Sequence, residues 1–369
     1  MRRRYIFGII VSFILFFLGG MYLFQSLQQG GSDGEEESVT GVQPRSMQEN
    51  ENLQIVNPPE KVALSQTQFV SQTFNNCGPA SLSMMMSLLG KNISQQELGE
   101  KMRPFNNPLG GVDDKSIFAP EFVETAKEYG FESLHRPNGS IELLKKFTAN
   151  GIPVVVRTWL NPQEDIGHFR VVRGYDETTK TILQDDSYQG PNLSYSYNEF
   201  LKMWQPFNYG YILVYPKDKQ KIVEAILGEE MDEKIAWENA LEKAEKELQN
   251  NPSDSYTKFN ISVANYYLGN YDRSIEFYEM ARSGLPPRML WYQYEPLQAY
   301  LKMKHYDTVF SLTENILMSG NSAYSELYLL RGQAYVEQGR VDDAEMEFEK
   351  AVYYNRNSKV AQKALVSVL

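Results

Sequence analysis

The C-terminal part of the chain carries a repeat, and this repeat restricts the possible fold more than any other feature. Pro252 and Pro286 lie 34 residues apart, and the short motifs that begin at Gly269, Lys304 and Gly339 recur every 35 residues. A unit of this length holds two helices, which bury their apolar faces only by stacking on the next unit. The pattern therefore predicts an all-α solenoid for this part of the chain.

The last unit has the clearest pattern of small and aromatic positions, which are Tyr328, Gly332, Tyr335, Gly339, Ala344, Phe348 and Ala351. This spacing resembles the tetratricopeptide repeat (TPR). The resemblance implies TPR-like helical repeats over residues 217–369. It also implies close contact between the two helices of the unit at Gly332 and Ala344.

The other units fit this pattern less well. The unit at about 290–323 is degenerate, with Pro296 inside its first predicted helix. Residues 236–248 supply a half repeat in front, and residues 360–369 supply a terminal capping helix. Solenoids of this kind commonly bind a peptide or a protein partner on their concave face. The alternative is a spacer that only extends or stabilises the rest of the chain.

The N-terminus predicts a membrane anchor. An uncharged apolar run over residues 5–24 follows the basic stub 1–4, and the first charges after the run are acidic. About 20 apolar residues span a bilayer as a helix, and the arginines favour a cytoplasmic N-terminus. We expect a single-pass protein of the cell membrane whose remaining parts lie outside the cytoplasm. A cleaved signal peptide is the alternative, although its apolar core is normally shorter, about 7–15 residues.

The composition excludes several classes of function. The chain has 36 basic and 47 acidic residues and no long Lys/Arg cluster, so we expect no nucleic-acid partner. The single cysteine, Cys77, excludes an intrachain disulfide framework, and the three histidines are widely spaced. We therefore expect no metal site and no cofactor. His135 and His305 are expected in exposed loops, which leaves the chemistry of one thiol.

Residues 25–60 and 61–216 differ sharply in pattern. The first segment is acidic, rich in Gly, Ser and Gln, and lacks apolar periodicity, so it predicts a flexible tether. The second segment begins with predicted helices at 82–89, 94–102, 118–129 and 140–149. It continues with predicted strands at 153–156, 168–175, 181–183 and 209–215. Helices followed by strands predict an α+β domain with one helical layer packed on an antiparallel sheet.

Cys77 lies directly before the first predicted helix of this domain, within Asn75-Asn76-Cys77-Gly78-Pro79. The positive end of a helix dipole stabilises a thiolate, which is the reactive form of cysteine. The backbone N–H of the same residue can face the oxyanion that nucleophilic attack creates. The alternative is a small buried cysteine, but core packing gives no reason for this polar sequence at a helix start.

A thiolate nucleophile needs a base, and the base needs a group that orients it. His168 begins a predicted strand, and the next predicted strand ends in Asp185 and Asp186. A carboxylate on a neighbouring strand fixes the tautomer of an imidazole. Gln72, five residues before the cysteine, could donate to the oxyanion. The alternatives are a strand-edge histidine and an ordinary turn.

These motifs together resemble a known family. The segment from about Gln66 to Tyr215 resembles the C39-like branch of the papain-like cysteine peptidases. The matching pieces are Gln72 with Asn76–Ala80, Gly167–Phe169 with Gly174–Asp176, Asp186–Gly190, and Tyr197–Phe200 with Trp204.

The resemblance implies a role for each candidate residue. It implies that Cys77 is the nucleophile and His168 the general base. It also implies that Asp186, rather than Asp185, is the orienting carboxylate and that Gln72 is an oxyanion donor. The best-known members are fused to ABC transporters and cut leader peptides after a double glycine. This sequence contains no ATPase motif, so double-glycine specificity does not carry over.

The sequence as a whole predicts an exported, membrane-tethered cysteine peptidase of bacterial type. It would hydrolyse peptide bonds by a Cys-His-Asp mechanism, and the repeats would recruit or position a protein partner. One alternative is a catalytically silent papain-like binding module. Another is a thiol acyltransferase or amidase that acts on a non-protein substrate.

Overall fold

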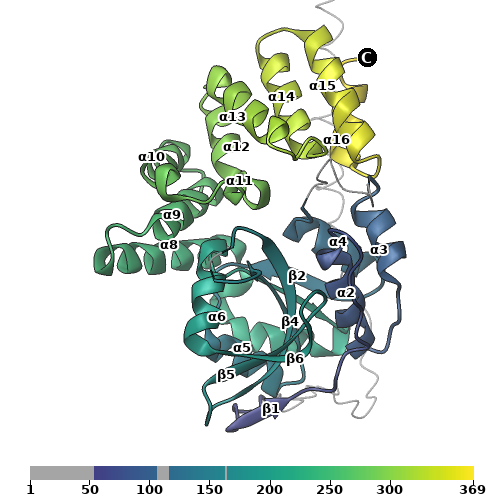
Figure 1. Cartoon of the computed structure of the whole chain (residues 1–369), viewed down its shortest axis with the longest axis vertical. Coiled ribbons are helices and arrows are strands. Elements are labelled where there is room, and N and C mark those ends of the chain that lie inside the picture. The colour runs from purple at the N-terminus through teal and green to yellow at the C-terminus, as the bar shows by residue number, and fades with distance from the viewer. Residues whose placement is uncertain (1–53, 106–115, 163) are drawn as a thin grey trace, which may run out of the picture. The chain divides into compact units, whose positions relative to one another are not determined.

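The computed structural model describes residues 54–105, 116–162 and 164–369 (Figure 1). Residues 53–369 form one compact unit. The predicted anchor at 5–24 lies outside the described residues, as does most of the predicted tether. Within the described ranges, no helix is both long and apolar enough to cross a membrane.

The first domain is built on an antiparallel sheet. Its strands are β1 (Lys61–Ala63), β2 (Glu132–Arg136), β3 (Val154–Trp159), β4 (Gly167–Asp176), β5 (Thr181–Asp186), β6 (Gly190–Ser196) and β7 (Tyr211–Tyr215). The order across the sheet is β2-β7-β3-β4-β5-β6, and β1 pairs with β4. The predicted antiparallel sheet is confirmed. The prediction missed three strands. These are the three-residue β1 and the edge strands β2 and β6, which carry polar residues without a clear period of two.

Helices cover both faces of this sheet (Figure 1). One face carries α2 (Cys77–Leu88), α3 (Gln95–Met102) and α4 (Ala119–Glu128). The other face carries α5 (Ile141–Ala149), α6 (Tyr197–Trp204) and α7 (Gln220–Leu227). The expectation of one helical layer was therefore wrong. Val154 and Val156 face the α5 side while Val155 faces the α2 side, and such an unbroken apolar run is typical of a strand buried on both faces.

The helix ends follow the predicted signals. Ser94 caps α3 by accepting a hydrogen bond from the N–H of Glu97 at 3.1 Å. The Glu97 side chain accepts instead from the hydroxyl of Tyr129, at 2.6 Å, and so ties α3 to the end of α4. Gly130 and Gly151 follow α4 and α5 with positive φ angles of 89° and 75°, the left-handed conformation that ends many helices.

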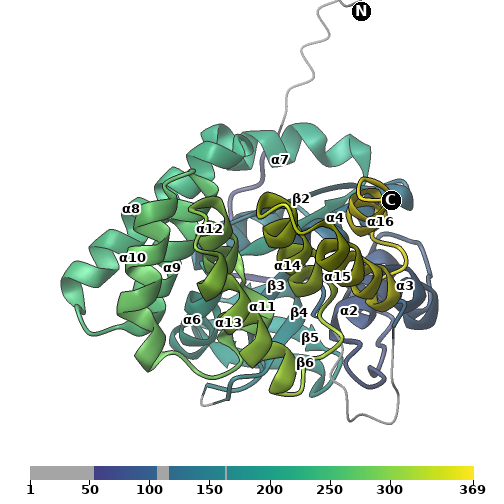
Figure 2. The same cartoon turned by 90° about the horizontal axis from the view of Figure 1, so that it is seen from above.

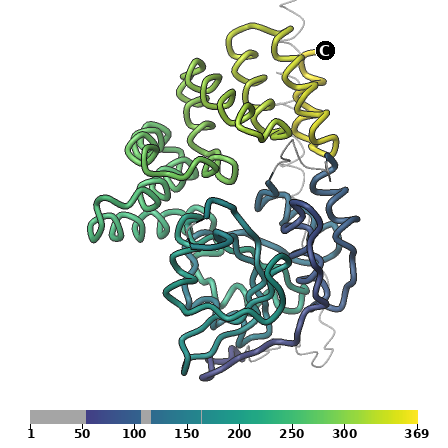
Figure 3. Tube along the Cα trace, in the orientation of Figure 1, coloured from purple at the N-terminus to yellow at the C-terminus, as the bar shows by residue number. Residues whose placement is uncertain are grey.

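Residues 217–369 are helical, as predicted. The helices after α7 are α8 (Glu233–Asn250), α9 (Ser255–Tyr267), α10 (Tyr271–Ala281), α11 (Met289–Tyr292), α12 (Glu295–Lys302), α13 (Tyr306–Met318), α14 (Ser325–Glu337), α15 (Val341–Tyr354) and α16 (Lys359–Val366). They follow one another along the trace in Figure 3. The pairs α9/α10 and α14/α15 lie side by side (Figure 2).

The degenerate unit differs from the prediction at Pro296. The chain breaks between α11 and α12, so Pro296 lies in the first turn of α12 and not in the middle of a longer helix. Proline is tolerated there since the N–H it lacks would be unpaired. The break leaves α11 as a short helix that packs against the first domain.

The two parts share one hydrophobic core. Trp159 at the end of β3 packs against Tyr292 of α11, with ring centroids 5.8 Å apart. Phe207 lies against the same indole, at 4.7 Å. The Gln293 amide donates to the Pro206 carbonyl at 2.8 Å. These contacts hold α11 beside the start of β4.

Gly332 provides a test of the repeat packing. A methyl group at this position in α14 would overlap the ring of Phe348 in α15. We expect Gly332→Ala to lower the free energy of unfolding by about 1–2 kcal/mol, because overpacking outweighs the better helix propensity of alanine. Denaturant titration measures the change.

The matched control is Gly99→Ala in α3, where the added methyl group would lie 3.4 Å from the Asn76 side chain, an ordinary contact. This variant should be neutral or slightly stabilising. Equal stability of the two variants would contradict the close helix contact at Gly332.

Candidate active site

Cys77 is the first residue of α2 and is partly accessible. The helix begins there because the Asn76 carbonyl accepts the first intrahelical bond, from Ala80 at 2.9 Å. Pro79 has no N–H, so the N–H groups of Cys77 and Gly78 are those that the helix leaves unused. A side chain at Gly78 would lie 2.8 Å from Ile117, so only glycine fits this position without a shift.

His168 and Asp186 lie on the neighbouring strands β4 and β5 and are both buried. The Nε2 atom of His168 is 2.8 Å from Oδ1 of Asp186. The same oxygen accepts from the N–H groups of Tyr188 and Gln189, each at 2.8 Å. The thiol of Cys77 and the imidazole of His168 act on each other's pKa, and because Nε2 is engaged with Asp186, Nδ1 is the ring atom left to meet the thiol.

Asp185 points to a different network. Its carboxylate pairs with Arg173 at 3.0 Å and accepts from the Thr67 hydroxyl at 2.7 Å and the Asn192 N–H at 2.8 Å. Side chains of successive strand residues face opposite sides of a sheet, so only one of the two aspartates reaches His168. The structure places Asp186 there.

The charges of the site favour an ionised pair. Burial alone would raise the pKa of the Cys77 thiol, but the hydrogen bond to His168 and the imidazolium charge lower it overall. Burial alone would lower the pKa of His168, but its hydrogen bonds to Asp186 and Cys77 raise the pKa to about 9. Both shifts favour the thiolate–imidazolium form of the pair over the neutral form.

Asp186 stays ionised despite its burial. Burial alone would raise its pKa, but the hydrogen bond and charge of His168, followed by the charge of Arg170, lower it overall. The guanidinium Nε of Arg170 is 3.2 Å from the second carboxylate oxygen. Sequence reasoning missed Arg170, although it lies two residues after His168 and so on the same face of β4.

Gln72 is tied to the residue that follows Asp186. Its backbone N–H donates to the Ser187 carbonyl, and its side-chain Oε1 accepts from the Ser187 hydroxyl, both at 2.9 Å. The amide oxygen is thus occupied, which leaves the amide Nε2 to donate elsewhere. The structure brings Cys77, His168 and Asp186 together and bonds Gln72 to Ser187, the residue after Asp186.

Two further residues near the thiol could not be found from sequence. The positive charge of Arg157 on β3 contributes to the lowered pKa of Cys77. Tyr292, from the repeats, packs over Gly167, where a side chain would lie 2.9 Å from its ring. His135 was also misplaced by the prediction, because it lies on β2 and not in a loop.

The described residues contain no cluster of three or more His, Cys, Asp or Glu side chains arranged to hold a metal ion.

Residues 62–212 match the Peptidase_C39 like family, which confirms the resemblance predicted for this segment. A search of curated proteins gave no similar sequence.

Solved structures give matches to both parts of the chain. A protein described as a C39-like peptidase, from Bacillus anthracis, is 20% identical and covers 43% of this chain and 99% of its own, with a TM-score of 0.37. The peptidase domain of Streptococcus ComA, a bi-functional ABC transporter, is 24% identical and covers 40% and 97%, with a TM-score of 0.32. A TPR protein of Thermus thermophilus is 21% identical and covers 38% and 77%, also with a TM-score of 0.32.

The ionised pair predicts an unusual pH dependence of alkylation. Iodoacetamide should react with wild-type Cys77 with a midpoint well below about 8.5, the value of a free thiol. In His168→Ala the midpoint should rise above that of wild type, because burial remains while the partner charge is lost. Because the chain has one cysteine, mass spectrometry of the whole protein reports on this thiol alone.

His305→Ala is the control, since His305 is exposed at the start of α13. Alkylation of Cys77 in this variant should have the same pH midpoint as in wild type. The same midpoint in wild type and His168→Ala would contradict the ion pair.

Proposed function

We propose that the chain is a cysteine peptidase in which Cys77, His168 and Asp186 are the catalytic group. The observation that carries the proposal is the chain of coupled groups that runs from the thiol at the start of α2 through the imidazole to a buried carboxylate, which the imidazole meets at 2.8 Å. A buried cysteine with only a packing role has no need of such a chain.

The geometry supports a two-stage mechanism. The Cys77 thiolate attacks the carbonyl carbon of the scissile bond, and a C–S bond forms as the carbonyl oxygen becomes an oxyanion. The C–N bond then breaks, and the His168 imidazolium gives its proton to the leaving amine. The neutral imidazole next takes a proton from water, which attacks the thioester. The C–S bond breaks, and the products are a carboxylic acid and the restored thiolate–imidazolium pair.

The oxyanion would be held at the start of α2. The N–H groups of Cys77 and Gly78 are left unused by the helix and lie at its positive end. We assign the Nε2 of Gln72 as a further donor, because Ser187 occupies the amide oxygen and so directs Nε2 away from itself. Asp186 orients the imidazole and stabilises its charge.

Variants of the catalytic pair test the activity. Cys77→Ala should abolish cleavage, and His168→Ala should lower the rate by about 10²–10⁴, the usual contribution of a general base. Digestion of a proteome-derived peptide library, followed by mass spectrometry, measures cleavage without a known substrate. Circular dichroism checks that the variants are folded. Undiminished cleavage by folded Cys77→Ala would rule out the mechanism.

We also propose that the body of the protein is exported and tethered to the cell membrane, with the repeats available to a protein partner. The apolar run at 5–24, preceded by arginines and followed by acidic residues, supports this location.

A membrane-impermeant methanethiosulfonate reagent tests the location. Added to intact bacterial cells that express the full chain, it should label Cys77, the only cysteine and a partly accessible one. Cys77→Ala serves as the control for labelling. Labelling only after the cells are lysed would place the domain in the cytoplasm.

A further inference from the structure

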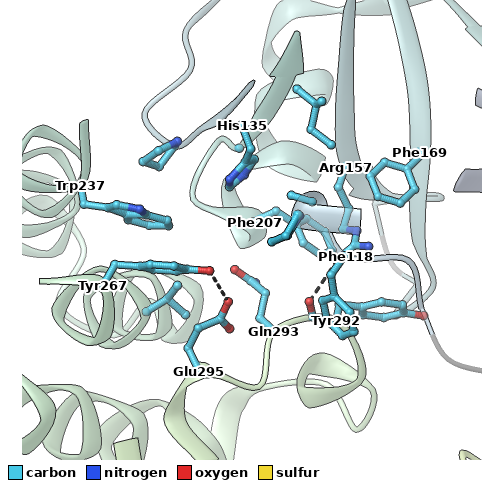
Figure 4. Close-up of a pocket in the computed structure, with 16 residues that line it drawn as sticks. Phe118, His135, Arg157, Phe169, Phe207, Trp237, Tyr267, Tyr292, Gln293 and Glu295 are labelled. Atoms are coloured by element: carbon cyan, nitrogen blue, oxygen red, sulfur yellow. Dashed lines mark hydrogen bonds between the residues drawn. The ribbon is translucent and has the colours of Figure 1, made fainter. Parts of the chain in front are cut away.

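A cavity of about 70 Å³ lies between the sheet and the repeats (Figure 4). The repeats contribute Trp237, Tyr267 and Glu295 to its walls, and the sheet contributes Arg157 and Phe169. A cavity volume of about 10–15 Å³ is enough to hold one water molecule, so this cavity is large enough for several waters or for a ligand group.

Glu295 is the unusual residue of this cavity. It is 9% exposed, and one carboxylate oxygen accepts from the Tyr267 hydroxyl at 3.0 Å. The other oxygen, Oε2, is fully buried and has no hydrogen-bond partner among the described residues. No cation among those residues forms an ion pair with it. A buried carboxylate of this kind costs free energy unless a cation or a donor meets it.

A second acceptor lies nearby. The Nε2 of Gln293 is used in its bond to Pro206, so its Oε1 is left as an acceptor. Burial raises the pKa of Glu295 overall, whereas its hydrogen bond from Tyr267, the charge of Arg157 and its position at the start of α12 favour the ionised form. A cation bound at Oε2 would complete this stabilisation. This side of the cavity is therefore suited to a group with several N–H donors and a positive charge.

The aromatic walls suit the rest of such a group. Trp237 and Tyr267 stack with centroids 4.1 Å apart and planes 8° apart. Aromatic faces of this kind accept aliphatic stems and attract cations. Trp237 is buried, whereas Tyr267 is 40% exposed, so this aromatic pair runs from the interior to the surface of the protein.

The cavity also adjoins the candidate catalytic pair. Phe169 follows His168 in β4, and its backbone hydrogen-bonds the Cys77 thiol. The Arg157 guanidinium stacks on the Phe169 ring at 4.4 Å and donates to the Tyr292 carbonyl at 3.1 Å. The positive charge of Arg157 is thus held at the end of the cavity nearest the thiol, whereas Glu295 lies on the side of the cavity formed by the repeats.

We propose that this cavity binds a lysine or arginine side chain of the peptide substrate, with its charged group on Glu295 and its stem against Trp237 and Tyr267. The inference rests on the proposed peptidase function. It assigns the repeats a direct part in substrate selection, through residues of α8, α9 and α12.

The first test is peptide capture by the inactive full chain. Detergent-solubilised Cys77→Ser protein is mixed with synthetic decapeptides that differ only by lysine, arginine, norleucine or glutamate at each position. We expect lysine and arginine peptides to be enriched over norleucine peptides about 10- to 100-fold, the worth of a hydrogen-bonded buried charge. Adding Glu295→Gln should remove this preference.

Glu276→Gln is the matched control. It removes the same charge from an exposed position in the repeats, where Glu276 pairs with Arg273. The chain has a net charge of -11 and attracts basic peptides in a general way, and this variant measures that contribution. Enrichment that persists in Glu295→Gln, or that Glu276→Gln lowers equally, would overturn the assignment.

The second test is cleavage of the same peptides by the wild-type chain. Cut sites should have a lysine or arginine at one fixed position, and Glu295→Gln should lower the lysine-to-norleucine ratio of kcat/KM by about 10- to 100-fold. Cleavage without a basic preference would overturn the pocket and leave the peptidase. Glu295-dependent capture without any cleavage would support the pocket and overturn the peptidase.

Discussion

The site depends on a charge that is placed inside the sheet. The Asp186 carboxylate is fully buried, and a buried carboxylate is tolerated only when other groups replace the water it has lost. His168, two backbone N–H groups and Arg170 do this together. The imidazole is consequently fixed in position and in tautomer, and its remaining nitrogen faces Cys77. This arrangement lowers the pKa of the thiol and so favours its ionised form.

The same constraint explains the pair of consecutive aspartates at the end of β5. Their side chains leave opposite faces of the strand, and each meets its own arginine, Arg170 for Asp186 and Arg173 for Asp185. The pairing of β5 with β6 is irregular at this point, since the register shifts between Gln184 and Asp186. The edge strand β6, which sequence analysis missed, is thus the segment that returns the chain past both carboxylates.

The features that could be predicted from the sequence depend on residues that lie close together along the chain. The start of α3 after Ser94 was predictable because its signals lie within a few residues. The first helix was predicted at 82–89, but α2 begins at Cys77, because Gly78 and Pro79 form its first turn. The placement of His168 and Asp186 on neighbouring strands was predictable, because the two strands of a hairpin are close together along the chain. Arg170 was within reach as well, since a period of two places it on the face of His168.

The features that could not be predicted depend mostly on contacts between residues that lie far apart along the chain. Tyr292 reaches Gly167 from a different domain, and no periodicity encodes such a contact. His135 lies on an edge strand that is too polar to be recognised, and the turn signals after it suggested a loop. The break at Pro296 depends on docking, because α11 is only four residues long and is held by Trp159 and Phe207 rather than by its own helix propensity.

The contacts of α11 bear on the role of the repeats. A spacer would need only a terminal contact with the domain it extends. Here Trp159 and Phe207 share a core with Tyr292, and a side chain at Gly167 would strike that same tyrosine. Cores are close-packed, so a change at Tyr292 in the repeats must alter the packing at Gly167, the residue directly before His168. The repeats are therefore part of the wall around the candidate catalytic pair, and a partner bound on them would act on a unit that already includes the site.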